Sequence, residues 1–266
     1  MQFADDLKIF TSFSKSQTGK TKDLQKAIDS ITEWSENAKL ELNKSKTYVL
    51  SLGKTPTKVE YRLQNEPIKR ELTVRDLGFI LNEKLDFKLH WRTAIKKANF
   101  AIYSIFKSFC SSNVRLLLLL YKTFARPFLE YGTVVSNPTD MKTVKSIEAV
   151  QNTFTRRVMF RMAGRRILNT DPEYRSASDR LIDYNLQTLK DRREHFDVKF
   201  FQKLLLGKIA IDHNNYFSYS PTKTRRGHSY RWKKSKTKIS RLFFTNRVLN
   251  KVVNQSSRKN TDSDIS

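Results

Sequence analysis

Cysteine, glycine and proline are all scarce in this sequence of 266 residues. Cys110 is the single cysteine, so the chain cannot form an internal disulfide, and the class of secreted proteins held together by disulfides is excluded. The 7 glycines and 6 prolines argue against an all-β fold rich in loops and favour long helices. The composition therefore predicts a largely helical protein of a reducing, intracellular compartment.

A long hydrophobic run is also missing. The most apolar stretch, Leu116 to Leu120, is soon interrupted by Lys122 and Arg126. No apolar stretch follows a charged N-terminal region, as it does in a secretory signal. We therefore expect no membrane partner and no secretion.

Acidic residues are too few to balance the basic ones. The chain carries 51 Lys and Arg against 26 Asp and Glu, which gives a net charge of +25. Such an excess makes a compact chain repel itself unless a polyanion offsets it. The cations are spread along the whole chain and do not line one amphipathic face, so nucleic acid is a better explanation than a membrane surface.

The excess is greatest near the C-terminus, where thirteen Lys and Arg and no Asp or Glu lie between Lys223 and Lys259. Phosphate-binding charge mixed with aromatic rings suits single-stranded nucleic acid. The predicted contact residues are Arg225, Arg226, Arg231, Trp232, Lys233 and Lys234. The same cluster suits a nuclear-import signal, so we expect a nuclear location, and the sequence leaves both roles open.

The hydrophobic periodicity predicts an α+β fold in which strands come first and helices follow. Helices are expected over 24–38, 91–109, 116–129 with a disturbance at Pro127, 144–158, at least one within 181–206 and, more briefly, 239–252. Strands are expected at 7–10 and 47–52, and residues 59–63 are expected to pair with 72–81 around the Asn65-Glu66-Pro67 turn.

Asp5 and Asp6 are the residues best suited to chemistry. An acidic pair on the turn of a tight hairpin presents carboxylate oxygens, which Mg²⁺ prefers, and metal ions promote phosphoryl transfer. Taken alone the pair is weak evidence, because adjacent acids at turns are common. The residues that follow it decide how it is interpreted.

The order of residues after this turn resembles the reverse transcriptases of non-LTR, or LINE-type, retrotransposons. The resemblance covers roughly residues 2 to 207, and it depends on six elements in series because no single motif carries it. The elements are Phe3-Ala4-Asp5-Asp6; Trp34 with Leu40-Glu41-Leu42-Asn43 and Lys46-Thr47; Val74-Arg75-Asp76-Leu77-Gly78-Phe79-Ile80-Leu81 with Leu85-Asp86-Phe87 and His90; Leu120-Tyr121-Lys122 with Arg126-Pro127-Phe128-Leu129-Glu130-Tyr131-Gly132; Ile147-Glu148-Ala149-Val150-Gln151 with Phe154-Thr155; and Leu189 to Arg193. Two departures are Asn82 and Val135, where the family commonly has Asp and Trp.

This resemblance implies roles for particular residues. Asp5 and Asp6 would be catalytic ligands of Mg²⁺, Lys46 would approach the nucleotide phosphates, and Leu77 and Gly78 would contact the primer. The implied activity is that of an RNA-directed DNA polymerase, a nucleotidyltransferase whose partners are an RNA template and a DNA primer. The implied layout is the C-terminal part of a palm at 1–58, a primer-grip-like hairpin at 59–83, and a helical thumb and following helical region at 84–207. The excess of basic charge, and not the resemblance, predicts a partly disordered basic tail at 208–266.

In this family the fingers and the first metal-binding Asp precede the Asp-Asp turn, and this sequence contains neither before Asp5. We therefore expect a truncated polymerase that binds Mg²⁺ weakly or not at all. We also expect it to be inactive alone, because phosphoryl transfer depends on positioning and electrostatics. Two alternatives stay open: a non-catalytic helical module that binds nucleic acid through its charge, and a missing half supplied by another polypeptide.

Overall fold

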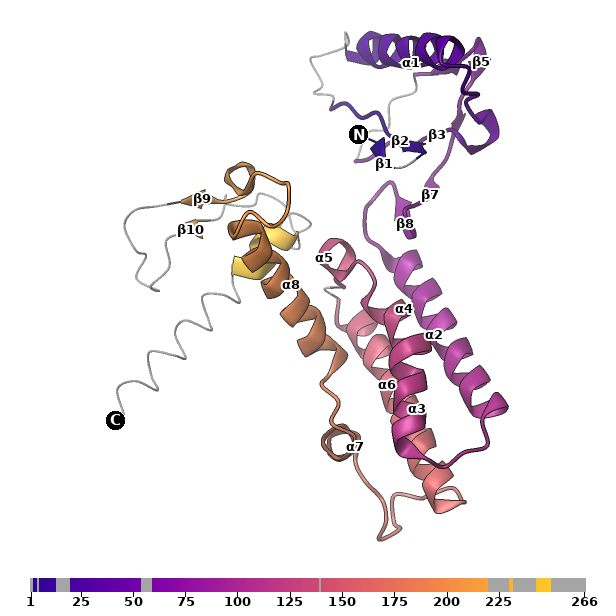
Figure 1. Ribbon diagram of the computed structural model, residues 1–266, viewed down its shortest axis with the longest axis vertical. Helices are drawn as coiled ribbons and strands as arrows, with labels where there is room; N and C mark the ends of the chain where they lie inside the picture. The colour runs from indigo at the N-terminus through magenta and orange to yellow at the C-terminus, as the bar shows by residue number, and fades with distance from the viewer. Residues whose placement is uncertain are drawn as a thin grey trace. The chain divides into compact units, whose positions relative to one another are not determined.

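The computed structural model describes residues 2–3, 5–12, 20–53, 59–138, 140–219, 230–231 and 243–249. It separates into two compact units, Met1–Phe87 and Lys88–Ser266 (Figure 1). The first unit combines one long helix with short strands, and the second is mainly helical. The α+β class is therefore confirmed at this level, while the assignment to palm and thumb stays a prediction.

The strands of the first unit pair two by two. Its elements are β1 (Gln2–Phe3), β2 (Asp6–Leu7), α1 (Lys20–Asn37), the 3-10 turn η1 (Lys44–Lys46), β3 (Tyr48–Val49), β4 (Arg62–Leu63), β5 (Glu66–Pro67), β6 (Lys69–Arg70), β7 (Thr73–Asp76) and β8 (Phe79–Asn82). The pairs β1–β2, β4–β5 and β7–β8 are antiparallel hairpins, and β3 runs parallel to β6. The predicted pairing of 59–63 with 72–81 is wrong, because each segment folds back on its nearest neighbour.

Helix α1 packs against the β4–β5 hairpin through Ile28, which is buried with Tyr61 and Leu63. The side-chain amide of Gln25 strengthens this contact by donating to the carbonyl of Arg62 and accepting from its N–H, both at 2.9 Å. Trp34, predicted to lie on the same apolar stripe, is 55% exposed. At about 100° per residue it lies roughly 120° around the helix from Ile28, outside the packed face.

The second unit is built from longer helices. Its elements are α2 (Lys88–Ser108), α3 (Val114–Leu120), the π-helical segment η2 (Tyr121–Ala125), α4 (Arg126–Glu130), α5 (Thr133–Ser136), α6 (Met141–Ala163), α7 (Ala177–Asp183), α8 (Leu189–Leu205), the 3-10 turn η3 (His213–Asn215), β9 (Ser218–Tyr219) and β10 (Tyr230–Arg231). Residues 244–249 are also helical. The helices predicted at 91–109 and 144–158 are confirmed as α2 and α6. The prediction of at least one helix over 181–206 is confirmed by α8 and the end of α7, which are separated by a turn at Asn185, whose φ is +46°.

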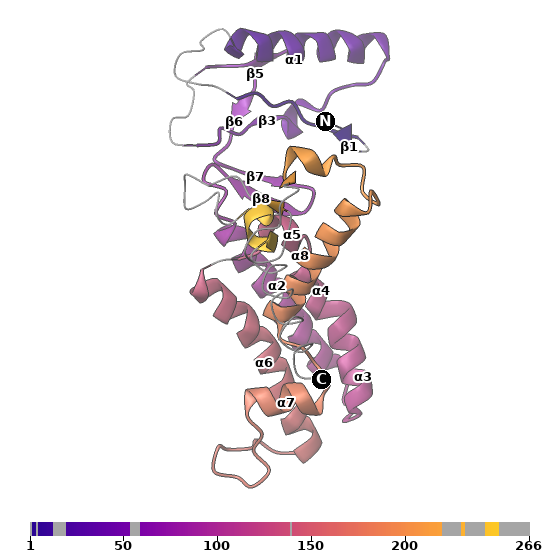
Figure 2. The ribbon, with the colours of Figure 1, turned by 90° about the vertical axis from the view of Figure 1, so that its left-hand side faces the viewer.

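Helices α2, α4 and α6 and the segment η2 lie side by side around the core of the second unit (Figures 1 and 2). The rings of Tyr121 and Phe154 stack at 4.3 Å between centroids, and both side chains are fully buried. The indole N–H of the buried Trp91 donates to the carbonyl of Ser136 at 2.6 Å. Aromatic packing with satisfied polar atoms therefore fixes the helices against one another.

The disturbance predicted at Pro127 is confirmed as the π-helical turn η2, which ends immediately before α4. Proline has no N–H to donate and its ring crowds the carbonyl four residues back. The N–H of Arg126 bonds instead to the carbonyl of Tyr121, five residues earlier. The wider turn lets one continuous ridge of α3, η2 and α4 pass the proline.

The last described residues belong to the second unit. Val248 and Leu249, on the helix at 244–249, are buried in one cluster with Phe201, Leu204 and Phe217. The boundary expected at residue 208 therefore does not separate a basic tail from the helices. Of the helices that the structure describes, none is both long and apolar enough to cross a membrane.

Candidate nucleic-acid interface

The acidic pair lies on the β1–β2 hairpin, as the sequence predicted, with a shift of one position. Register pairs Phe3 with Asp6, so Asp5 lies in the turn and Asp6 begins β2. Both aspartates are exposed. The segment after them is not the half-buried strand that was predicted, because Leu7, Ile9 and Phe10 are 47%, 39% and 78% exposed. The hairpin therefore has no packed apolar face along these residues.

The acidic pair does not form a complete metal site within the described part of the chain. Among those residues, no group of three or more His, Cys, Asp or Glu could hold a metal ion. Mg²⁺ requires near-octahedral oxygen coordination and gives up its water reluctantly. Two exposed carboxylates without further protein ligands fit that requirement poorly.

An ion pair brings the acidic hairpin together with the predicted primer-contact hairpin. Lys8 Nζ lies 2.7 Å from Asp76 Oδ1, and both side chains are about 30% exposed (30% and 27%). Lys8 follows β2 directly, and Asp76 ends β7 next to Leu77. The structure therefore places two of the predicted sites within one local region of the first unit.

The tip of the β7–β8 hairpin has an unusual sequence for its conformation. Asp76 pairs with Phe79, and the loop residues Leu77 and Gly78 have φ of +44° and +86°. Positive φ at both positions defines a type I′ turn, for which Asn-Gly is the preferred sequence. A leucine in the left-handed region costs roughly 1–2 kcal/mol. Strained residues that persist in a structure often mark functional surfaces, and Leu77 is 36% exposed.

Replacing Leu77 with asparagine is expected to stabilise this hairpin by about 1 kcal/mol, because asparagine tolerates positive φ. The measurement is native-state hydrogen exchange at the amides of β7 and β8, which should slow roughly fivefold. The turn between β4 and β5 supplies a control in the opposite direction, because an asparagine, Asn65, already lies there at a positive φ of +63°. Asn65→Leu should speed exchange in β4 and β5 by a similar factor, and unchanged exchange in both variants would contradict the assigned strain.

Lys46, the predicted phosphate contact, is the last residue of η1 and is exposed. The Asn43 side chain caps this turn, accepting from the N–H of Lys46 at 3.1 Å and from the Ser45 hydroxyl at 2.7 Å. Lys44 is instead paired with Glu66 at 2.8 Å. Asn43 thus has a structural role, which is to hold the backbone that presents Lys46.

The structure describes one of the six predicted C-terminal contact residues. Arg225, Arg226, Trp232, Lys233 and Lys234 lie outside the described residues. Arg231 lies in β10, where its backbone pairs with Ser218 of β9. Their role in binding nucleic acid stays a prediction.

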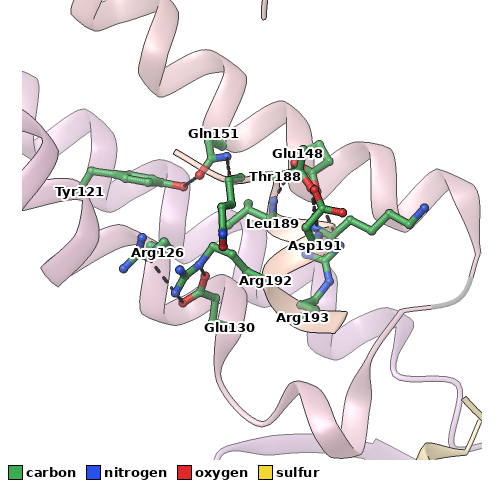
Figure 3. A network of polar contacts seen from close by, with 12 residues as sticks. Tyr121, Arg126, Glu130, Glu148, Gln151, Thr188, Leu189, Asp191, Arg192 and Arg193 are labelled. Atoms are coloured by element: carbon green, nitrogen blue, oxygen red, sulfur yellow. Dashed lines mark hydrogen bonds and ion pairs between the residues drawn. The ribbon is translucent and has the colours of Figure 1, made fainter. Parts of the chain in front are cut away.

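The structure adds a network of charged side chains, most of them partly buried, that the sequence did not reveal (Figure 3). Glu130 accepts from Arg192 at two positions, one of them 3.1 Å, and lies 3.5 Å from Arg126. Glu148 accepts from the backbone N–H groups of Leu189 and Lys190 at 3.2 and 2.7 Å, and so caps the start of α8. Two of the elements that resemble the polymerase family, 126–132 and 189–193, are therefore held together in this network.

Arg193 differs from the other charged residues of that network, because its guanidinium group makes no hydrogen bond to the described residues (Figure 3). Its side chain is 1% exposed and the nearest carboxylate oxygen, on Glu148, is 3.8 Å away. None of its three guanidinium nitrogens has a hydrogen-bond partner in the part of the chain that the structure describes. Burial lowers the pKa of Arg193, although nearby carboxylates, Glu148 foremost, oppose this effect.

Comparison with known proteins gives distant matches. The chain is 27% identical over 135 residues to an uncharacterised protein of Caenorhabditis elegans, covering 51% of this chain and 64% of that protein. It is 24% identical over 213 residues to the RNA-directed DNA polymerase from mobile element jockey of Drosophila melanogaster. That alignment covers 76% of this chain and 21% of the jockey polymerase.

The second match relates the chain distantly to an RNA-directed DNA polymerase from a mobile element. The chain spans less than two thirds of the length of either relative, at 64% and 21%. No protein-family profile matches it, and no solved structure does.

Proposed function

We propose that this chain derives from the reverse transcriptase of a non-LTR retrotransposon, and that it binds nucleic acid without extending a primer on its own. The observation that carries the proposal is the similarity to the jockey polymerase along 76% of the chain. The ion pair between Lys8 and Asp76 supports it, because it brings the acidic hairpin close to the strand that leads to Leu77 and Gly78. In a working polymerase the metal-binding residues and the primer contact must also lie close together.

The lack of catalysis follows from the incomplete metal site. Asp5 and Asp6 would supply carboxylates to Mg²⁺, which when bound would offset the charge that develops on a transferring phosphoryl group. In the described part of the first unit no third His, Cys, Asp or Glu joins them in a group that could hold the ion. Two carboxylates alone position a metal too loosely for a reaction that depends on positioning.

Nucleic-acid binding follows from charge and from the exposed groups of the first unit. The net charge of +25 favours a polyanion, and Lys46 and the Leu77-Gly78 tip would contact backbone and primer. Arg225, Arg226, Arg231, Trp232, Lys233 and Lys234 would add phosphate contacts and base stacking. The natural substrate would be an RNA template annealed to a DNA primer.

The test is primer extension on an RNA template with Mg²⁺, run beside a fluorescence-anisotropy measurement of binding to the same duplex. We expect the duplex to bind at low salt and the primer to stay unextended, because the charge is present and the metal site is incomplete. The matched control is the double variant Asp5→Asn, Asp6→Asn, which should bind equally well. Extension that disappears in this variant would show an active polymerase, and absence of binding would reject the proposal altogether.

A further inference from the structure

A basic hollow of about 770 Å³ lies between the C-terminal half of α6, the chain that follows it, and α7. Helices α6 and α7 contact each other at this end of the second unit (Figure 2). Arg156, Arg157, Arg166 and Arg180 line the hollow together with the rings of Phe160 and Tyr174. Four cations around two aromatic rings are suited to a ligand that combines phosphates with bases.

Arg180 lies at the bottom of this hollow and is only 2% exposed. Its guanidinium donates to the Thr155 hydroxyl at 3.2 Å, to the carbonyl of Arg175 at 2.5 Å and to the side-chain carbonyl of Asn152. All three acceptors are neutral. Burial lowers the pKa of Arg180, although the nearby side chains of Tyr174 and Tyr184 oppose this effect. A buried cation held only by neutral oxygens is stabilised when an anion approaches it.

The carboxylates near the hollow already form ion pairs with other arginines or cap a helix. Arg165 forms ion pairs with Asp171 at 2.8 Å and Glu173 at 3.1 Å. Arg175 donates to both carboxylate oxygens of Asp183, at 3.0 and 2.9 Å. Asp179 caps the start of α7 together with Ser176. These pairings neutralise Arg165 and Arg175. Arg156, Arg157 and Arg166, which line the hollow, form no ion pair with a carboxylate of the described residues.

A second hollow of about 640 Å³ adjoins the first and shares Arg157, Phe160 and Arg166 with it. It adds Lys107 and Arg161 to the positive lining. Arg161 is fixed by its bonds to the carbonyls of Phe106 and Phe109, at 2.9 and 2.7 Å. The guanidinium carbons of Arg157 and Arg161 each lie 5.4 Å from the centre of the Phe106 ring. The two hollows together form a surface that we call the arginine groove.

We propose that the arginine groove binds a single-stranded nucleic acid, with Arg156, Arg157 and Arg166 contacting phosphates, the buried charge of Arg180 attracting them from beneath, and Phe160 and Tyr174 contacting bases. A strand fits better than a lone phosphate because the cations extend through both hollows; Arg157 and Arg161 alone are one helical turn, roughly 6 Å, apart. The site lies entirely in the second unit and uses neither Asp5 nor Asp6. It therefore holds or fails independently of the proposed polymerase ancestry.

The test compares two double variants of the full chain that remove equal charge from exposed positions of α6 and the residues after it. Arg156→Gln, Arg166→Gln changes the groove, and Lys142→Gln, Lys145→Gln changes the other end of α6. Binding of a fluorescent 20-nucleotide single-stranded RNA is measured over a range of salt concentrations. At about 0.7 per phosphate contact, the groove variant should lower the slope of log affinity against log salt by about 1.4, with a clearly smaller change in the control.

A photo-crosslinking experiment locates the strand. RNA carrying 4-thiouridine should crosslink to Phe160 or Tyr174 in the unchanged chain and in the Lys142, Lys145 variant, and these crosslinks should disappear in the Arg156, Arg166 variant. Equal slopes in the two double variants, or crosslinks only elsewhere, would overturn the proposal. Uridine monophosphate is the third arm: if it displaces the RNA at an equal concentration of phosphate groups, the ligand is a nucleotide and the strand assignment is wrong. If the double variant fails to fold, the single variant Arg166→Gln replaces it, with half the slope change expected.

Discussion

Asp197→Ala should lower the free energy of unfolding of the second unit by about 3–5 kcal/mol, the usual cost of removing one partner of a buried ion pair. Asp197 is 0% exposed and lies on α8. Its carboxylate accepts from Arg247 at 2.7 and 2.9 Å and from the Asn137 amide at 3.1 Å. Removing it leaves the guanidinium of Arg247 buried without its carboxylate, although the carbonyl of Val134 still accepts from it at 2.8 Å.

Urea denaturation followed by circular dichroism measures this effect, and Asp183→Ala is the matched control. Asp183 also binds an arginine at two positions, but the side chains of Arg175 and Asp183 are 52% and 35% exposed. An exposed pair contributes less than about 1 kcal/mol. Equal losses in the two variants would contradict the view that burial makes the pair with Arg247 important.

Arg193→Met should instead raise the free energy of unfolding, by about 1–4 kcal/mol. Replacing a buried charge by an apolar side chain of similar length removes its desolvation cost, and stabilisations of this size follow where the charge is poorly paired. Arg193 meets that condition, since its closest carboxylate oxygen is 3.8 Å away. Glu148 would keep its two hydrogen bonds to the backbone of α8.

The neighbouring position supplies the control. Arg192 binds Glu130, whose side chain is 12% exposed, so Arg192→Met should destabilise the unit by about 1–3 kcal/mol. Both variants lose one positive charge from adjacent residues of α8. The two arginines differ in how well they are paired and in burial, at 24% exposed for Arg192 and 1% for Arg193. A loss of stability in Arg193→Met comparable to that in Arg192→Met would mean that Arg193 has a stabilising role that its contacts do not explain.

The long helices could be predicted because their apolar stripes repeat over many turns. Trp91, Ala94, Ala98, Ile102 and Ile105 were all on the predicted stripe of α2, and all are buried. The strands were harder, because most of them contain two residues and so cannot show alternation. Their pairing was decided by local turns at Asn65 and Gly78, and the prediction of a longer-range pair was therefore wrong.

The candidate sites likewise include features that could be predicted from the sequence and features that could not. The position of Asp5 and Asp6 on a hairpin followed from local sequence, and the structure moved the turn by one residue. The burial of Arg180, Arg193 and Asp197 could not be predicted, because charged residues are normally placed at the surface when only sequence is considered. Their partners lie far away in the sequence; Asp197, for instance, binds Arg247 at a separation of 50 residues.

The packing of Val248 and Leu249 against Phe217 has a consequence for the basic C-terminal region. Phe217 and Val248 lie in the same buried cluster, so the segment of the sequence that carries the nine lysines and arginines between 220 and 242 is joined at both ends to the second unit. Closing a loop reduces the number of conformations open to the free chain, and each further residue adds little to that restriction. A polyanion that engages a segment held at both ends therefore has less chain entropy to overcome than one that engages a chain with a free end.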